Sequence, residues 1–179
     1  MNRRAYAITQ AAVIAAAYVI LTLPFAQFAF GPVQFRLAET LTTLAALTPA
    51  AVPGLFLGCL LTNLMYPSGL GIIDVIFGSL ATLAAAWLTW QLQQRLPQPP
   101  AMKLWLRRVL VLLPAAVVNA LVIGFYLPFL LPDITVAPLV TISFMFSIFI
   151  SELVVIYLIG LPLMMAIDKS GLLKQSRFF

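Results

Sequence analysis

The chain has 179 residues, of which 63% are hydrophobic and 8% charged, and its mean hydropathy is +1.09. These values exclude an ordinary soluble globular domain and predict an integral membrane protein. The absence of histidine and of any G-x-x-x-x-G-K-[ST] string, with Cys59 as the one cysteine, excludes a P-loop nucleotide site, a histidine-dependent triad, a histidine-ligated metal site and an internal disulfide. We expect no cofactor or metal, and interpret the net charge of +5 as basic cytoplasmic loops rather than nucleic-acid binding.

The apolar runs between charged or Pro/Gly-rich breaks predict the helices, because about 20 residues are needed to cross about 30 Å of hydrocarbon. Thr48 to Gly54 contains two prolines and predicts a tight turn between two short runs rather than one continuous helix. The sequence therefore predicts an all-α membrane protein, a single transmembrane domain over residues 1–179. Its six transmembrane helices are expected at residues 5–30, 35–48, 50–66, 71–94, 104–131 and 139–167.

Basic residues predict the orientation in the membrane. Arg3 and Arg4 precede the first run, four basic residues lie in the segment 95–108, and Lys169, Lys174 and Arg177 follow the last run. Because loops rich in Lys and Arg stay on the inner side, both termini are predicted to be cytoplasmic in a multi-pass protein of the cell (plasma) membrane. The first run exceeds a signal-peptide core and no clear cleavage site follows it, so we expect the first helix to be retained.

A few polar side chains lie in or beside the apolar runs, where lipid cannot satisfy them and an unpaired group is costly. Asp133, beside Pro132, is interpreted as a solvated turn residue. Six others are candidate binding residues for a small solute: Arg36, Glu39, Asn63, Asp74, Asn119 and Glu152.

These candidates also have structural interpretations that the sequence leaves open. Arg36 and Glu39, at i and i+3 on one helical face, could pair with each other. Asp74 could cap the N-terminus of the fourth helix, and Asn119 could bond across helices without any ligand. Glu152 lies about 15 Å into its run, by the rise per residue of a helix, and needs a distant partner.

Short helices broken by proline and glycine, with carboxylates and amides on five of them, predict a recess that opens outward for a small polar solute. Phe35, Phe77 and Tyr126 are candidate aromatic walls for a flat ring, since aromatic faces stack. Aromatic residues also line every membrane interface, and that alternative stays open.

The first helix carries small residues at helical spacing. Ala7, Ala11 and Ala15 recur every four residues, with Ala12 and Ala16 on an adjoining row. Such a face lets another helix approach closely, either within the same bundle or from a partner protein.

Four segments resemble the QueT family: RLAETLT at 36–42, PGLFLGCLLTN at 53–63, GLGIIDVIFGSLATLAAA at 69–86, and the VVNA around Asn119. Members of that family are proposed substrate-binding (S) components of energy-coupling factor (ECF) transporters for queuosine precursors. The resemblance covers about half of the chain outright and runs in order through its length.

The resemblance implies a six-helix S-component bundle without ATPase subunits of its own. Such a subunit binds its ligand from outside and docks through the first helix on a transmembrane coupling subunit driven by two ATPases. The implied ligand is a 7-deazaguanine: queuine, preQ1 or preQ0. Glu39 or Glu152 can accept two hydrogen bonds from a guanine-like edge, and Asn63 and Asn119 can both donate and accept. Arg36 could close the outer mouth or hold Glu39 in place.

Three other functions remain open at this point. One is an S-component for another small vitamin, and a second is a stand-alone ion-coupled carrier with Asp74 and Glu152 as titrating groups. The third, a small membrane enzyme, is disfavoured because no nucleophile stands next to a base and no metal-ligand cluster appears, so we expect no enzymatic activity.

Overall fold

The computed structural model describes residues 3–31, 33–66, 70–132 and 134–170. Asp133, Lys174 and Arg177, which entered the sequence predictions, lie outside these ranges. Within the described residues every regular element is a helix, which confirms the predicted all-α class.

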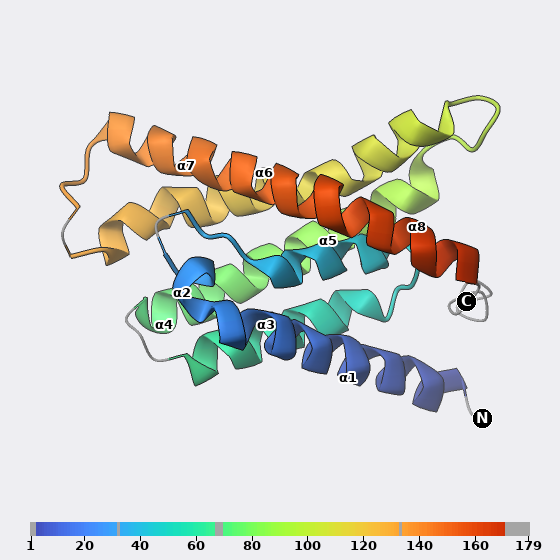
Figure 1. The fold of residues 1–179 in the computed structure, drawn as a ribbon, viewed down its shortest axis with the longest axis horizontal. Helices are drawn as coiled ribbons and strands as arrows, with labels where there is room; N and C mark the ends of the chain where they lie inside the picture. The colour runs from blue at the N-terminus through green and yellow to red at the C-terminus, as the bar shows by residue number, and fades with distance from the viewer. Residues whose placement is uncertain (1–2, 32, 67–69, 133, 171–179) are drawn as a thin grey trace.

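The helical elements form six consecutive segments along the chain (Figure 1). Two of the short elements are 3₁₀ helices that precede α2 and α3, and two are π-helical stretches inside longer segments, η3 and η4. In chain order the elements are α1 (Arg3–Thr22), η1 (Leu23–Phe25), α2 (Ala26–Ala29), η2 (Leu37–Ala46), α3 (Ala51–Met65), α4 (Gly71–Ile73), η3 (Asp74–Gly78), α5 (Ser79–Arg95), α6 (Leu104–Leu130), α7 (Pro138–Leu153), η4 (Val154–Gly160) and α8 (Leu161–Ser170).

Four segments of the described chain are long and apolar enough to cross a membrane. They are Arg4–Ala29, Gly71–Arg95, Leu104–Leu130 and Pro138–Ser170. The helix α3 is apolar but has only 15 residues, and η2 has 10, about 20 Å at the 3₁₀ rise. Six full crossings, and cytoplasmic termini, therefore stay predictions.

The short helix η2 occupies the middle of the bundle. It contacts α1, α3, α5, α6, η4 and α8, and all its residues from Ala38 to Ala46 are buried. Ten residues is long for a 3₁₀ helix. Thr42 and Thr43 contribute to its geometry, since their hydroxyls donate to the carbonyls of Glu39 and Thr40, three residues earlier (2.6 and 2.7 Å). A helix surrounded by other helices can hold polar groups away from lipid.

The longer helices pack around η2 in a chain of neighbours: α1 on α3, α3 on α5, α5 on α6 and α6 on α7. Glycines allow the closest of these approaches. A Cβ at Gly54 would lie 2.7 Å from the carbonyl oxygen of Ala11, and one at Gly58 would lie 2.6 Å from the Cβ of Tyr18. The pair Gly54 and Gly58 thus forms a small-xxx-small face that receives α1.

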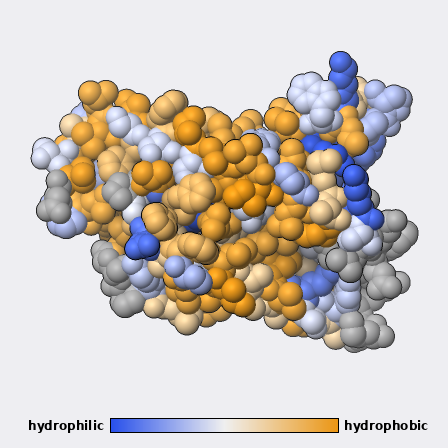
Figure 2. Space-filling model, in the orientation of Figure 1, coloured by the Kyte–Doolittle hydropathy of each residue, from blue (hydrophilic) through white to orange (hydrophobic). Residues whose placement is uncertain are grey.

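The start of α1, the end of α8 and the 95–108 segment lie at the same end of the bundle (Figure 1). This end, here called the basic end, carries Arg4, Arg95, Lys103, Arg107, Arg108 and Lys169 among the described residues. Figure 2 shows hydrophobic surface across the middle of the molecule and hydrophilic residues gathered at the basic end. The opposite end, where α6 leads to α7, is called the distal end.

Candidate functional site

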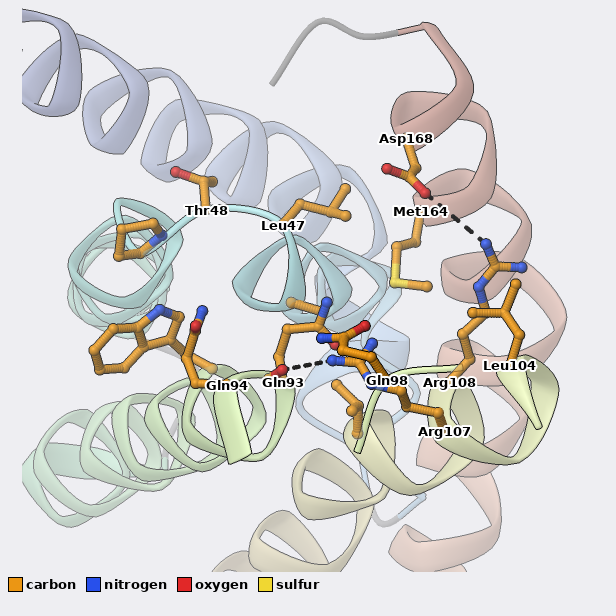
Figure 3. A pocket seen from close by; sticks show the side chains of 14 residues that line it. Leu47, Thr48, Gln93, Gln94, Gln98, Leu104, Arg107, Arg108, Met164 and Asp168 are labelled. Carbon is orange, nitrogen blue, oxygen red and sulfur yellow. Dashed lines mark hydrogen bonds and ion pairs between the residues drawn. The ribbon is translucent and has the colours of Figure 1, made fainter. Parts of the chain in front are cut away.

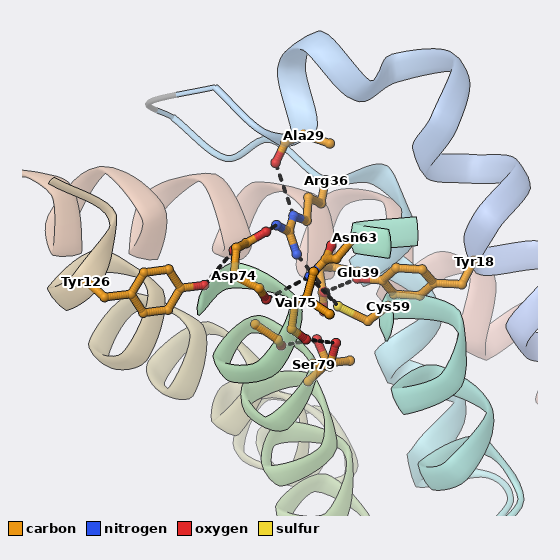
Figure 4. A network of polar contacts seen from close by, with 12 residues as sticks. Tyr18, Ala29, Arg36, Glu39, Cys59, Asn63, Asp74, Val75, Ser79 and Tyr126 are labelled. Carbon is orange, nitrogen blue, oxygen red and sulfur yellow. Dashed lines mark hydrogen bonds and ion pairs between the residues drawn. The ribbon is translucent and has the colours of Figure 1, made fainter. Parts of the chain in front are cut away.

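All six polar candidates are buried inside the bundle, with between 0% and 6% of each residue exposed. They come from η2, α3, η3, α6, α7 and the extended segment before η2, and they form two neighbouring clusters. Figure 4 shows one of them around Arg36 and Asp74, with Glu39 and Tyr18 beside it.

The first, the Arg36–Asp74 cluster, is an ion pair held at both partners. Arg36 Nη2 lies 3.6 Å from Asp74 Oδ2, and its Nε donates to the carbonyl of Ala29 (3.1 Å). The Tyr126 hydroxyl donates to Asp74 Oδ1 (2.6 Å). Because each charge has a partner, the cluster can remain buried without a ligand.

Asn63 and Cys59 complete the Arg36–Asp74 cluster. Asn63 Nδ2 donates to the backbone carbonyl of Asp74 (3.0 Å), and Cys59 Sγ accepts from both Asn63 Nδ2 and Arg36 Nη1 at 3.8 Å. Gly78 leaves room for these groups, since a Cβ there would lie 3.1 Å from Asn63 Nδ2 and 3.2 Å from Asp74 Oδ1.

Two structural alternatives raised by the sequence are therefore not the interactions found. Arg36 pairs with Asp74, 38 positions along the chain, instead of with Glu39. Asp74 does not cap a helix start, because α4 begins at Gly71 and Leu70 occupies the capping position. It opens the π-helical η3 instead, and π-bulges occur frequently at functional sites.

The second, the Glu39–Glu152 cluster, joins α1, η2, α6 and α7. The Tyr18 hydroxyl donates to Glu39 Oε1 (2.6 Å), and Asn119 Nδ2 donates to Glu152 Oε1 (2.9 Å). Asn119 and Thr82 lie within interaction range of Glu39. The carboxyl groups of Glu39 and Glu152 are close enough to repel each other.

Three acceptor atoms of this cluster have no hydrogen-bond partner among the described residues: Glu39 Oε2, Glu152 Oε2 and Asn119 Oδ1. Leaving a buried polar group unpaired costs about 1–3 kcal/mol, and more when it is charged, so native proteins rarely do so without a functional reason. One oxygen of each carboxylate accepts a hydrogen bond from Tyr18 or Asn119, and the other oxygen is available to a ligand. The arrangement is suited to a ligand with several N–H donors.

The aromatic candidates separate in the structure. Tyr126 serves Asp74, and the half-exposed ring of Phe77 lies 6.3 Å from that of Tyr126 at a tilt of 48°. A flat stack forms elsewhere, between Phe30 and Tyr66, whose ring centroids are 4.6 Å apart. The Arg36 guanidinium lies 4.8 Å from the centre of the Phe30 ring.

Phe35 lines a groove of about 550 Å³ between the segment before η2 and the outer face of α7. The groove is mostly apolar, with three serines on α7. Its lining residues are Val33, Phe35, Ile142, Ser143, Phe146, Ser147, Ile150, Ser151 and Val154. Phe35 adjoins Arg36 in sequence and Ser151 adjoins Glu152, so each cluster has a chain neighbour in the groove.

A second cavity, of about 350 Å³, lies at the basic end (Figure 3). Polar side chains of this cavity have partners within the protein. Arg107 Nη2 donates to the backbone carbonyl of Gln93 (2.5 Å), and Arg108 Nη2 lies 3.9 Å from Asp168 Oδ2. None of the six polar candidates lines this cavity.

Tyr18 and Gln34 are buried polar residues that the sequence did not indicate as candidates. Tyr18 is 1% exposed and holds Glu39. Gln34 is 2% exposed and precedes Arg36 by two positions. A hydroxyl inside an apolar run and a glutamine next to a charged motif were the available signals, but both residue types are also ordinary at membrane interfaces.

The alanine rows of α1 serve two different surroundings. Ala15 is buried and Ala11 meets Gly54 of α3, so this row packs inside the bundle. Ala7, Ala12 and Ala16 are exposed, together with Ile8 and Ile20. Ala7 of the first row and the second row, Ala12 and Ala16, are therefore open to another protein.

Comparison with known proteins relates this chain to membrane transporters. The model of a family described as QueT transporter matches residues 8–169. A curated relative, the queuosine precursor transporter QueT of Lactococcus lactis subsp. cremoris (strain MG1363), is 34% identical over 82 residues, 45% of this chain and 47% of the relative. The chain thus matches about half the length of that relative. No solved structure matches the chain with significance.

Both the family and the relative are transporters and not enzymes. The family match covers nearly the whole chain and includes every candidate residue of both clusters. The resemblance seen in the sequence motifs is confirmed: the chain belongs to the QueT transporter family.

Proposed function

We propose that this protein is the substrate-binding subunit of an ECF-type importer and binds a 7-deazaguanine precursor of queuosine in the Glu39–Glu152 cluster. The observation that carries the proposal is the set of three buried acceptors without partners, on Glu39, Asn119 and Glu152. Family membership and the name of the relative support the same ligand class.

The chemistry of the ligand complements these acceptors. A 7-deazaguanine presents a ring N–H beside an exocyclic amine, and a carboxylate can accept one hydrogen bond from each. The second carboxylate then faces another ring N–H or, in preQ1 and queuine, a cationic amine that offsets the repulsion between Glu39 and Glu152. A buried site of this kind rejects analogues that lack the matching groups.

The Arg36–Asp74 cluster acts as the support of this site. It joins the segment before η2 to η3, α3 and α6. Of the side chains involved, those of Arg36, Asn63 and Asp74 are buried and that of Tyr126 is partly buried. Because Arg36 directly precedes η2, the ion pair anchors the end of η2 that carries Glu39. We place Arg36, Asn63 and Asp74 in positioning roles and Glu39, Asn119 and Glu152 in ligand contact.

The orientation follows from the charges at the two ends. The basic end holds the clustered Lys and Arg side chains and by the positive-inside rule faces the cytoplasm of the cell. The segment before η2, with Arg36, then faces outward, so ligand enters from outside. In this arrangement η2 and α3 are the short second and third of six membrane segments.

Inward transport driven by ATP requires partner proteins, because the chain has no P-loop to hydrolyse ATP. We propose that the exposed row of α1, formed by Ile8, Ala12, Ala16 and Ile20, docks on a transmembrane coupling subunit driven by two ATPases. Small residues among larger apolar ones permit close helix approach there.

Ligand binding by the purified full chain tests the proposal directly. Queuine, preQ1 and preQ0 should raise the thermal midpoint of unfolding, because a ligand that binds only the native state stabilises it. Guanine and a panel of vitamins serve as comparison ligands in the same thermal-shift or calorimetric screen. Stabilisation by a vitamin and by none of the deazaguanines would replace this function with that of an S-component for the vitamin.

The nearness of the Glu39 and Glu152 carboxyl groups favours a second candidate, a carrier that works alone with protons or cations. Asp74, the other candidate of the sequence analysis, is engaged by Arg36 and Tyr126. Uptake of preQ1 into proteoliposomes that contain this chain alone, without ATP, would establish the carrier. Uptake that requires the coupling subunit and ATP supports the importer.

A further inference from the structure

Gln34 combines three features that rarely occur together. Its residue is 2% exposed, and both side-chain atoms, Nε2 and Oε1, have no hydrogen-bond partner in the described structure. Its backbone has φ = 53°, a left-handed conformation that is uncommon for any residue but glycine, asparagine or aspartate. Neighbouring backbone bonds hold it there, from Gln34 N to the Gly31 carbonyl (3.1 Å) and from Phe35 N to the Phe28 carbonyl (2.9 Å).

These features destabilise the empty protein. The unpaired amide and the left-handed backbone each lower the stability of the empty protein. Such strain is found preferentially at functional sites, where the surrounding structure maintains it. The buried amide of Gln34 therefore points to a ligand.

Gln34 lies two positions before Arg36, on the segment that leads into η2 and Glu39. Exposure alternates along the segment: Val33 is 53% exposed, Gln34 and Arg36 are 2% exposed, and Phe35 lies between them at the groove. Gln34 therefore shares the inner side of the segment with Arg36. Ser151, which lines the groove on α7 and adjoins Glu152, also has a buried side-chain atom without a hydrogen-bond partner in the described ranges, its hydroxyl.

The amide donors of the proposed site are engaged within the protein, whereas the amide of Gln34 is not. Arg36 Nη2 and the Ser151 hydroxyl also lack a hydrogen-bond partner in the part of the chain that the structure describes, but Arg36 Nη2 faces Asp74 in the ion pair. Asn119 Nδ2 is occupied by Glu152, and Asn63 Nδ2 by the Asp74 carbonyl and Cys59. Arg36 is engaged by Asp74, Ala29 and Cys59. A guanine-like edge, however, carries a carbonyl oxygen directly beside the ring N–H that a carboxylate would bind, and that oxygen needs a donor.

We propose that Gln34 is a specificity residue of the binding site, whose amide Nε2 donates to the ring carbonyl of the 7-deazaguanine. This inference rests on the proposed function. It adds an uncommitted amide donor to the acceptor-rich Glu39–Glu152 cluster, and it makes the segment 33–36 part of the site rather than only its cover.

The test compares two probes, 7-deazaguanine and 7-deaza-6-thioguanine, by calorimetry on the purified full chain. The thio compound keeps the ring N–H and the exocyclic amine but replaces the carbonyl oxygen with sulfur, a weaker acceptor. The wild type should bind the oxo compound at least about tenfold more tightly, as expected for one hydrogen bond in a buried site.

Gln34→Asn is the principal variant, because asparagine tolerates the left-handed backbone while its shorter side chain withdraws the amide. We expect unchanged or higher thermal stability, affinity for the oxo compound reduced by about tenfold, and an oxo-to-thio ratio near one. Gln34→Glu, which replaces the donor by an acceptor, should give the same loss. Gln10→Asn is the matched control: Gln10 also has an unpartnered Nε2, but it bonds to Thr48 near the basic end, and its affinity ratio should equal that of the wild type.

The outcomes separate this inference from the function on which it rests. If the wild type binds 7-deazaguanine and the Gln34 variants keep the oxo-to-thio preference, Gln34 does not read the carbonyl and only the inference is overturned. If the wild type binds neither probe, the proposed ligand class and the inference both fail. Glu39→Gln should weaken both probes alike and leave the ratio unchanged, which identifies Gln34 and not general damage as the source of discrimination.

Discussion

At the scale of residues, the two clusters differ in how far the protein satisfies its own polar groups. Within the described residues, Arg36 and Asp74 form an ion pair with help from Tyr126 and Asn63, in which Arg36 Nη2 alone among the buried side-chain atoms lacks a hydrogen bond. Glu39 and Glu152, in contrast, each keep one oxygen with neither a hydrogen bond nor an ion pair to the described chain. A satisfied buried pair stabilises a defined geometry, and an unsatisfied pair stores binding capacity at a cost in stability. In the proposed function, the first is the frame of the site and the second is its contact surface.

Replacing either carboxylate should therefore separate binding from stability. We expect Glu39→Gln and Glu152→Gln each to weaken preQ1 binding at least about tenfold, about 1.4 kcal/mol, in calorimetry. The thermal midpoint of the empty protein should stay the same or rise, because an unpaired buried charge is removed. Asp168→Asn, which alters a partly exposed ion pair at the basic end, is the control with unchanged affinity. Unchanged affinity in both glutamine variants would remove these carboxylates from the site.

At the scale of elements, the position of the site depends on η2 and on the glycine face of α3. The central 3₁₀ helix carries Glu39, and Tyr18 on α1 reaches Glu39 only because α1 lies close against α3. The two π-helical stretches begin at Asp74 and two residues after Glu152, so local irregularity accompanies both clusters. Helix packing and site geometry are thus linked through a few close contacts.

Gly58→Ala should disturb both at once. Its new Cβ would lie 2.6 Å from the Cβ of Tyr18 and 3.1 Å from the Ala15 carbonyl oxygen, both on a packed helix, so α1 must move. We expect a loss of about 1–3 kcal/mol in the free energy of unfolding, as for other overpacked cores. PreQ1 binding should weaken as well, because Tyr18 carries the shift to Glu39.

The control for this prediction is Leu57→Ala, on the same helix but 43% exposed, which should change neither property much. Unfolding followed by circular dichroism in detergent, together with calorimetry, measures both effects. Full stability and affinity in Gly58→Ala would show that the bundle adapts around this contact.

At the scale of the whole molecule, we expect the apolar exterior to face lipid and, on the exposed row of α1, the proposed partner subunit. Of the alanines first considered for docking, Ala11 and Ala15 lie against α3, and Ala7, Ala12 and Ala16 are exposed. A bulky residue on the exposed row should block a partner without entering the bundle. A bulky residue on the inner row should disrupt the bundle itself.

We expect Ala12→Trp and Ala16→Trp to abolish uptake of preQ1 by cells while the purified variants bind preQ1 as the wild type does. Ala15→Trp, at a position that is 6% exposed, should lose both uptake and binding. Ala84→Trp, at an exposed position of α5, controls for a tryptophan in lipid contact and should keep both. Normal uptake by the Ala12 and Ala16 variants would exclude this row as the docking face.

The sequence by itself determined the all-helical class, the family and the small set of buried polar candidates. Composition and hydropathy are local properties, and three long motifs, with the short VVNA around Asn119, identify the family without any knowledge of contacts. The number of membrane crossings and the side of the termini stay predictions from charge and length.

Only the tertiary structure decided which polar group meets which. Neighbours in sequence suggested Arg36 with Glu39, but Arg36 binds Asp74, Glu39 accepts from Tyr18, and the orphaned amide of Gln34 became apparent only through its burial. The physical reason is that a hydrogen bond or ion pair is made over about 3 to 4 Å in space. That distance is set by how distant helices pack, and helical spacing within one segment does not contain it.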